Sequence, residues 1–139
     1  MIQITIDHSV ADNGPWKSLL LCFAADGLPF EIHCWADETD AIALARQYGQ
    51  PVETNWRGGV VIGGVVTPQF RQMLADTVKP GDTELYNKQT PFFSIFLNKC
   101  FSSEHYGTEN YILTTPELSC QALLQHMAQL DGISMNCFT

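Results

Sequence analysis

Basic side chains are scarce in this sequence: only 7 of its 139 residues are lysine or arginine, against 15 aspartates and glutamates, so the net charge is −8. The seven basic residues are scattered singly along the chain. Binding to nucleic-acid phosphates requires a continuous stripe of positive charge. The composition therefore excludes a nucleic acid as the expected partner.

Signatures of metal, cofactor and nucleotide sites are also missing. The four histidines show neither an H-E-x-x-H motif nor the paired spacing of a zinc site. Glycines in the segment Gly58–Gly64 precede a predicted helix, but Val65 follows where a phosphate-binding loop needs lysine. No spacing marks two carboxylates as catalytic partners. We expect no metal, no cofactor and no enzymatic activity.

The cysteines lack the pattern of a disulfide framework, because their number is odd and no two have C-x-x-C spacing. This pattern is typical of buried free thiols in a reducing compartment. No signal peptide and no apolar run of membrane-spanning length is evident, so we expect a cytoplasmic protein that does not enter a membrane. Cysteine-dependent activity stays open, with Cys100 near His105 as the only local suggestion. The five cysteines are Cys22, Cys34, Cys100, Cys120 and Cys137.

Length and composition are ordinary for a folded domain. The hydrophobic fraction is 45% and the charged fraction is 16%, both near the globular average. A chain of this length encloses one hydrophobic core. We expect a single globular domain over residues 1–139.

Strand patterns occur in seven places. Residues 2–7 alternate apolar with polar side chains, and the β-prone runs 19–24 and 30–35 are separated by a turn, which predicts a hairpin. Cys34 and His33 should face opposite sides of the second run. Further strands are expected at 52–56, at 60–66 with a turn or bulge at Gly63-Gly64, at 110–114 and at 133–138.

Helix signals occur in four places. An acidic opening turn precedes an apolar stripe from residue 41 to 48, which predicts a first helix. Thr67-Pro68, Thr90-Pro91 and Thr115-Pro116 each place an N-cap residue before a proline suited to the first helical position. The helix after Thr90 would be apolar on all sides over Phe92–Phe101, so it is either fully buried or an interface.

These segments predict an α+β fold. We expect a mixed β-sheet of about five to seven strands with about four helices, from ordinary element lengths.

Negative charge is concentrated near the start of the chain. Residues 1–40 contain seven acidic side chains and one basic side chain, so they hold six of the eight excess negative charges. An acidic surface attracts a basic protein and speeds its association. Tryptophan and arginine are common at the energetic centres of interfaces. The predicted partner-binding residues are therefore Glu31, Trp35, Asp37, Glu38, Asp40, Trp56 and Arg57.

The chain as a whole resembles the small acidic immunity proteins of bacterial contact-dependent growth inhibition and secreted toxin systems. The resemblance rests on size, acidity, α+β pattern, cysteine pattern and the lack of catalytic signatures. It implies a non-enzymatic protein that binds one cognate toxin domain, often a nuclease with a basic active site, and occludes that site.

Two alternatives stay open. One is a small cytosolic enzyme or small-molecule-binding protein with a pocket near Gly58–Gly64. The other is a phage-encoded inhibitor of a bacterial defence complex, which would use the same physics on a different target.

Overall fold

The computed structural model describes residues 1–81 and 87–138. Within them, eight strands form one sheet in the order β3-β4-β2-β5-β6-β7-β1-β8, and each neighbouring pair is antiparallel. The strands are β1 (Ile2–Ile6), β2 (Pro29–Trp35), β3 (Gln50–Val52), β4 (Gly59–Val65), β5 (Ser94–Leu97), β6 (Phe101–Glu104), β7 (Glu109–Ile112) and β8 (Ile133–Cys137). The helices are α1 (Gly14–Phe23), α2 (Thr39–Arg46), α3 (Pro68–Asp76) and α4 (Leu118–Met127).

The predicted α+β class and the expected number of about four helices are confirmed, but only three of the four helices lie where the sequence predicted them, and α1 takes the place of the fourth. The sheet differs from the expectation in two respects. The described residues form eight strands instead of five to seven, and their pairings are antiparallel throughout instead of mixed. The extra strands are β5 and β6; the helix predicted over Phe92–Phe101 covers all of β5 and the first residue of β6.

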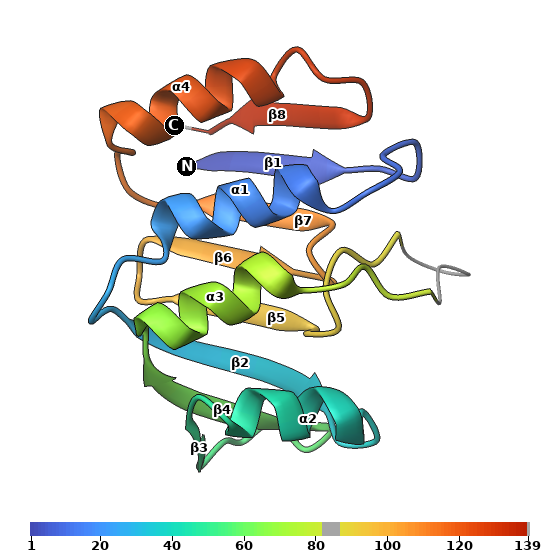
Figure 1. Cartoon of the computed structure of the whole chain (residues 1–139), viewed down its shortest axis with the longest axis vertical. Coiled ribbons are helices and arrows are strands. Elements are labelled where there is room, and N and C mark those ends of the chain that lie inside the picture. Colours follow the sequence, from blue (N-terminus) through green and yellow to red (C-terminus); the bar gives the residue numbers. More distant parts are fainter. Residues whose placement is uncertain (82–86, 139) are drawn as a thin grey trace.

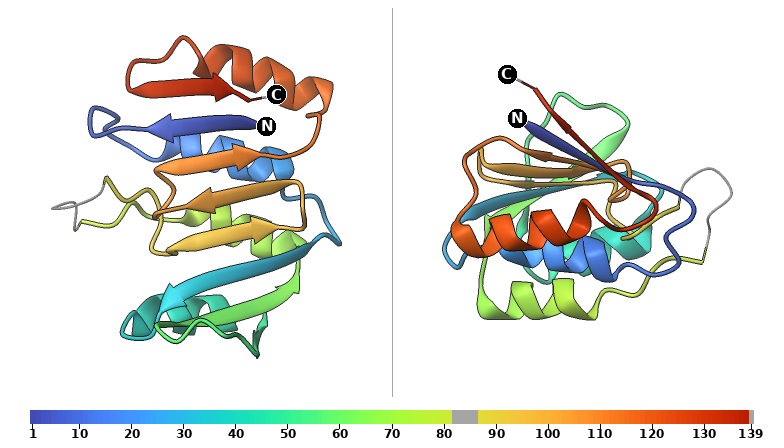
Figure 2. Two further views of the ribbon diagram at one scale, coloured as in Figure 1. Left: turned by 180° about the vertical axis from the view of Figure 1, so that it is seen from behind. Right: turned by 90° about the horizontal axis from the view of Figure 1, so that it is seen from above.

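The helices gather on one face of the sheet (Figure 1). We call this side the covered face. The view from behind in Figure 2 shows the other side of the sheet, which has no described helix in front of it and which we call the open face. Because side chains alternate along a strand, each strand supplies residues to both faces.

The core lies between the helices and the covered face. In β2, Phe30, Ile32 and Cys34 are at most 2% exposed. Phe70 of α3 stacks on Phe30, with 4.2 Å between the ring centroids. Burial of Cys34 beside a half-buried His33 confirms that these neighbours face opposite sides of the sheet.

The expected hairpin over 19–24 and 30–35 is wrong in its first half, because residues 19–24 belong largely to helix α1. Pro15 lies in the first turn, which suits the fixed φ of proline. Trp16, Leu19, Leu20 and Phe23 are the buried residues of α1, and their spacing of three and four places them on one side of a helix. The leucines at 19–21 fit both the two-residue period of a strand and the 3.6-residue period of a helix. Packing against the sheet stabilises the helix.

The expected helix after Thr90-Pro91 is also wrong. The Thr90 hydroxyl accepts a hydrogen bond from the Phe92 amide at 3.3 Å, but the chain then continues into β5 and β6. Ile95 and Leu97 are fully buried on the covered face, whereas Phe96 between them is half-buried. The apolar run therefore serves two faces of a central strand instead of all sides of a helix.

The other two threonine–proline starts fare differently. Thr67 is the N-cap of α3, and its hydroxyl accepts from the Phe70 amide at 3.1 Å, as expected. Helix α4 is present, but it begins at Leu118 with Glu117 at the N-cap position, so Thr115 does not cap it.

The glycine segment forms a regular strand. Gly63 pairs with Glu31 and Gly64 with Phe30 in unbroken register, so the expected turn or bulge is absent from β4. A Cβ on Gly64 would lie 2.9 Å from the Phe30 ring, which explains the glycine there by close packing. The strand predicted at 52–56 is shorter and earlier, since β3 ends at Val52.

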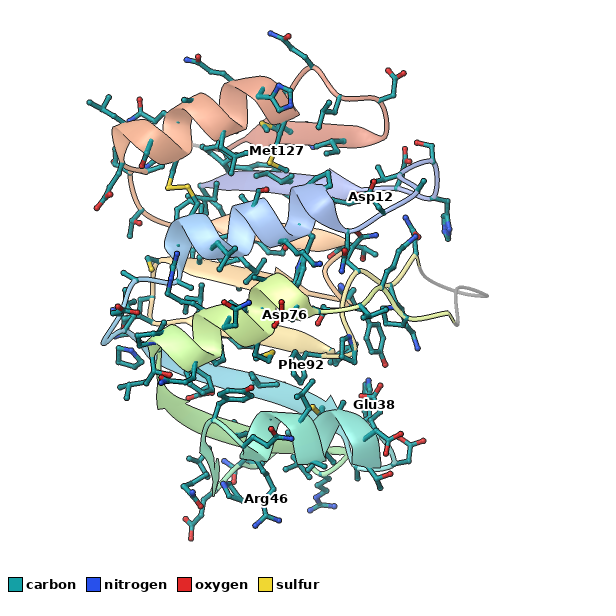
Figure 3. All side chains as sticks on the ribbon, viewed as in Figure 1. Asp12, Glu38, Arg46, Asp76, Phe92 and Met127 are labelled. Carbon is teal, nitrogen blue, oxygen red and sulfur yellow. A yellow bond between two sulfur atoms is a disulfide. The ribbon has the colours of Figure 1, made fainter. Side chains whose placement is uncertain are left out.

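A disulfide joins Cys22 of α1 to Cys120 of α4, which contradicts the expectation that the cysteines are all free thiols (Figure 3). The pair is separated by 98 residues, so local spacing carried no sign of it. Disulfides persist mainly in oxidising compartments, so the cysteine pattern no longer supports a cytoplasmic location, which stays a prediction. None of the helices in the described part of the chain is both long and apolar enough to cross a membrane.

Candidate functional site

The open face carries a cluster of aromatic rings over the neighbouring strands β2 and β5. We call this cluster the aromatic band. His33 contacts Phe96 at 4.8 Å and Trp56 at 5.8 Å between ring centroids. Trp35 contacts Trp56 at 4.8 Å and Phe93 at 5.1 Å, and Trp56 also reaches Phe93 at 6.1 Å. Trp35 is 37% exposed and the other four residues are half-buried. The band is thus one connected aromatic surface that solvent still reaches.

Glycines allow Trp56 to lie against the sheet. Trp56 belongs to the loop between β3 and β4, and a Cβ on Gly59 would overlap its ring. A Cβ on Gly58 would lie 2.7 Å from the ring of Trp35. The Gly58-Gly59 pair is therefore required for the close approach of both indoles to β4.

A histidine joins the band to a carboxylate on each side. His33 Nε2 lies 3.1 Å from Glu31 Oε1, and 55% of the Glu31 side chain is exposed. On the other side His105, edge-on to Phe93 at 5.6 Å, places Nδ1 2.9 Å from Glu109 Oε2. Among the described residues, these two contacts of the open face join a histidine to a carboxylate, and each is an ion pair only when its histidine is protonated.

Two carboxylates lie directly opposite each other beyond His105. Glu104 of β6 pairs with Glu109 of β7 in the antiparallel register. Each accepts a neutral hydroxyl: Ser102 donates to Glu104 at 2.9 Å and Tyr111 donates to Glu109 at 3.1 Å. The same carboxylates raise the pKa of the Tyr111 hydroxyl, after desolvation by burial as the largest cause. Like charges in directly opposite positions destabilise a sheet. We call Glu31, Glu104 and Glu109 the acidic rim.

Glu38 has a different position from the rim. Its Oε1 accepts the Trp35 amide at 2.8 Å and its Oε2 accepts the Tyr106 hydroxyl at 2.9 Å. Figure 3 labels it where β2 passes into α2. Both carboxylate oxygens thus tie the end of β2 to the turn after β6. Glu38 positions Trp35, and its charge is engaged within the chain.

The turn between β6 and β7 has an unusual backbone. His105 and Tyr106 have φ of 51° and 59°, and Gly107 follows at 85°. Left-handed conformation is unfavourable for residues with a Cβ. A Cβ on Gly107 would lie 2.7 Å from the ring of buried Trp16, so only glycine fits there. The turn directs His105 to Phe93 and Tyr106 to Glu38, two contacts that hold the candidate site together.

The remaining predicted contact residues are less central. Asp37 is exposed and lines a shallow hollow of about 520 Å³ with Trp35, Glu38 and Tyr106. Asp40 is exposed in the first turn of α2, and no contact recorded for the described residues joins it to the aromatic band. Arg57 is exposed beside Trp56 in the β3–β4 loop. The structure therefore brings together Glu31, Trp35, Asp37, Glu38 and Trp56.

A second hollow of about 670 Å³ lies beside the glycine strand. Its lining includes Gly63, Gly64 and Phe96, with Glu31 and Glu53 among its polar residues. It is open to solvent and shares Phe96 with the aromatic band. Small molecules have room at this position.

The free thiols of the described residues show little sign of activation. Burial raises the pKa of Cys34 to about 12, with a smaller contribution from the Glu38 charge. Burial also raises the pKa of Cys100, whose sulfur donates to the Leu97 carbonyl at 3.0 Å. A raised pKa lowers the fraction of nucleophilic thiolate at neutral pH. The described residues include no cluster of three or more His, Cys, Asp or Glu placed for a metal ion.

Sequence reasoning missed half of the site. Phe93 and Phe96 fell in the segment assigned to a buried helix, so their outward positions were hidden. Glu104 and Glu109 lie outside residues 1–40, where the negative charge is concentrated, so the charge distribution does not single them out. One signal could have revealed the outward position of Phe96. The residues Ser94, Ile95, Phe96 and Leu97 suit the two-residue period of a strand, and this period competes with the helix that the number of apolar residues suggests.

Comparisons with models of protein families, with curated proteins and with solved structures found no match to this chain.

Proposed function

We propose that this chain is a non-enzymatic inhibitor that docks on a basic protein through the open face of its sheet. In the version we favour, it is an immunity protein whose partner is a basic toxin domain, and docking occludes the active site of that domain. The proposal rests on the resemblance in size, acidity and pattern together with the chemistry of the open face.

The single observation that carries the proposal is the junction of the aromatic band with the acidic rim. Glu31 and Glu109 each reach the band through a histidine, and neither is neutralised by a lysine or arginine of the described residues. Such a surface has carboxylates for cations and large rings for buried contact area.

Arginine is the partner side chain that best fits this surface. Its planar guanidinium pairs with carboxylates through two parallel hydrogen bonds and also stacks on tryptophan. Trp35 is the most exposed ring of the band, and Asp37 lines the hollow beside it. An arginine over Trp35 would therefore find a carboxylate within the same site.

The opposed carboxylates support a docking role for a separate reason. Glu104 and Glu109 repel each other in the free protein, because they are directly opposite on neighbouring strands. A basic partner side chain placed between them would relieve that repulsion. Binding would thus be strengthened by an interaction that is unfavourable before the partner arrives.

The test is a fluorescence titration with a short arginine-rich peptide, with the same peptide carrying glutamate in place of arginine as the control ligand. Trp35 and Trp56 report binding, while Trp16 is fully buried and adds a constant background. The arginine peptide should change the emission, and its affinity should fall steeply with added salt.

Two matched pairs of variants locate the binding. Trp35→Ala and Glu109→Gln should weaken the arginine peptide by about tenfold each, which corresponds to about 1.4 kcal/mol. Leu118→Ala, at an exposed apolar residue of α4, and Glu117→Gln, at the exposed acidic N-cap residue before it, should leave it unchanged. Equal affinity in all four variants would refute docking at the open face. If a toxin domain that this chain inhibits is identified, the Trp35→Ala variant should inhibit it more weakly.

Small-molecule binding in the hollow beside Gly63 and Gly64 is a second candidate function, favoured by its volume of about 670 Å³. A ligand held there should be lost in Gly63→Val, because a Cβ on Gly63 already lies 3.2 Å from Val52 Cγ1. Trp35 does not line that hollow, so Trp35→Ala should leave the ligand bound. The two candidates therefore respond to different substitutions.

A further inference from the structure

The outer edge of strand β8 is open for pairing. Within the described residues, β8 is hydrogen-bonded to β1 alone and ends the sheet. The Phe138 amide donates to the Met1 carbonyl at 2.8 Å, and the Asp7 amide donates to the Gly132 carbonyl at 2.9 Å. Antiparallel bonding alternates along a strand. The backbone N–H and C=O groups of Met135 and Cys137 therefore point away from β1, toward the edge.

The opposite edge of the sheet is protected by comparison. Strand β3 has three residues, and Pro51 is the middle one. Glu53 follows directly. Short length, proline and charge are the usual devices that prevent edge pairing. Strand β8 has five residues, Ile-Ser-Met-Asn-Cys, with no charge, proline or glycine. The β3 edge therefore carries features that prevent strand pairing, whereas the β8 edge lacks them.

Charge points to the occupant of the β8 edge. Residues 118–138 contain one acidic side chain, Asp131, and no lysine or arginine, although the chain carries −8 overall. Figures 1 and 2 show α4 at the same end of the sheet as β8. The outward positions of α4 include Leu118, Ala122 and Gln125, which are exposed and uncharged. Two copies of an acidic chain can approach without strong repulsion at this end.

We propose that β8 pairs antiparallel with β8 of a second copy of this chain, with Met135 opposite Met135. In that register Ser134 lies opposite Asn136 and Ile133 opposite Cys137, so polar residues meet on the open face and apolar residues meet on the covered face. The strand is self-complementary, as a twofold interface requires. The outward N–H and C=O groups of Met135 gain partners on Met135 of the other copy. The Cys137 amide gains the Ile133 carbonyl, while the Ile133 amide keeps its bond to the Leu130 carbonyl at 3.4 Å. One continuous sheet then spans both copies.

The pairing has a geometric consequence. A twofold axis through the Met135 pair stands perpendicular to the sheet, so the open faces of both copies lie on the same side. The assembly presents two identical surfaces in one direction. Dimer formation itself does not depend on what the open face binds.

The test compares two substitutions at Cys137 by sedimentation over a range of protein concentrations. Proline there removes an N–H that points to the edge and leaves the bonds to β1 in place. Wild type and Cys137→Ser should sediment as dimers at micromolar concentration, and Cys137→Pro should sediment as a monomer with an unchanged circular dichroism spectrum.

Three results would overturn the proposal. Wild type could be monomeric at all concentrations, Cys137→Pro could remain dimeric, or the dimer could vanish in Cys137→Ser, which would make it a disulfide artefact. If Cys137→Pro fails to fold, Ser134→Lys combined with Asn136→Lys replaces it, because these side chains face solvent and would place lysines opposite each other. A dimer that persists in this folded double variant would also contradict the β8 pairing.

Discussion

The two faces of this sheet use the same strands for different purposes. In β2, Ile32 and Cys34 are fully buried on the covered face, while His33 and Trp35 between and beyond them stay accessible on the open face. The covered face is mostly apolar, and its buried polar residues, such as Ser103 and Asn110, lie under the helices. The open face keeps like charges opposite each other and tryptophan in contact with water. If the open face docks on a partner as proposed, stability and docking depend on alternate residues of one strand, so each can be changed separately.

The largest contrast should come from removing one aromatic ring on each face. Phe70→Ala deletes a fully buried ring stacked on Phe30, and should lower the free energy of unfolding by about 3–5 kcal/mol. Trp35→Ala removes a partly exposed ring and should lower it by about 1 kcal/mol. Urea unfolding followed by circular dichroism measures both.

The order of these two effects is what matters. If Trp35→Ala destabilises the protein as much as Phe70→Ala, the aromatic band is a second core and its exposure is incidental. A small loss of stability with a large loss of peptide affinity supports the division between the faces.

The second prediction concerns the disulfide on the covered side. Cys22→Ser together with Cys120→Ser should lower the free energy of unfolding by about 2–4 kcal/mol, because the bond restrains the unfolded chain across 98 residues. Cys137→Ser is the matched control and should change stability little, since that residue is exposed. Affinity for the arginine peptide should stay the same in all these variants.

If the double serine variant is as stable as the wild type, the disulfide does not contribute to the stability of the protein. A loss of peptide affinity there would mean that α4 and the open face are coupled, against the proposed separation.

Prediction from sequence succeeded where local signals agreed with the tertiary environment. Alternation at residues 2–7 and 30–35 gave β1 and β2, and the Thr67 cap gave α3. These features depend on neighbours in sequence, so they are visible in a single chain. The acidic residue Glu31 and the indoles of Trp35 and Trp56 were also placed in one site.

Prediction failed where the apolar residues fitted more than one structure. Residues 92–101 contain enough apolar side chains to fill either a buried helix or both faces of a central strand, and only the neighbouring strands decide between them. The pairing of Glu104 with Glu109 depends on the turn between them, whose left-handed residues 105–107 carry no sequence signature apart from Gly107. The disulfide depends on two helices far apart in sequence.

The smallest expected effect on stability is the most informative one. Glu104→Gln keeps an acceptor for the Ser102 hydroxyl and removes one of two opposed charges. It should raise the free energy of unfolding by about 0.2–1 kcal/mol through relief of repulsion. A decrease instead would mean that the two carboxylates are compatible in the free protein.

The central claim is that the acidic rim serves a basic partner at the expense of stability. The most direct measurement is the affinity of the arginine-rich peptide for Glu104→Gln, taken beside the unfolding curve of the same sample. The account predicts that affinity falls by about tenfold while stability is unchanged or higher. Unchanged affinity in that variant would contradict it.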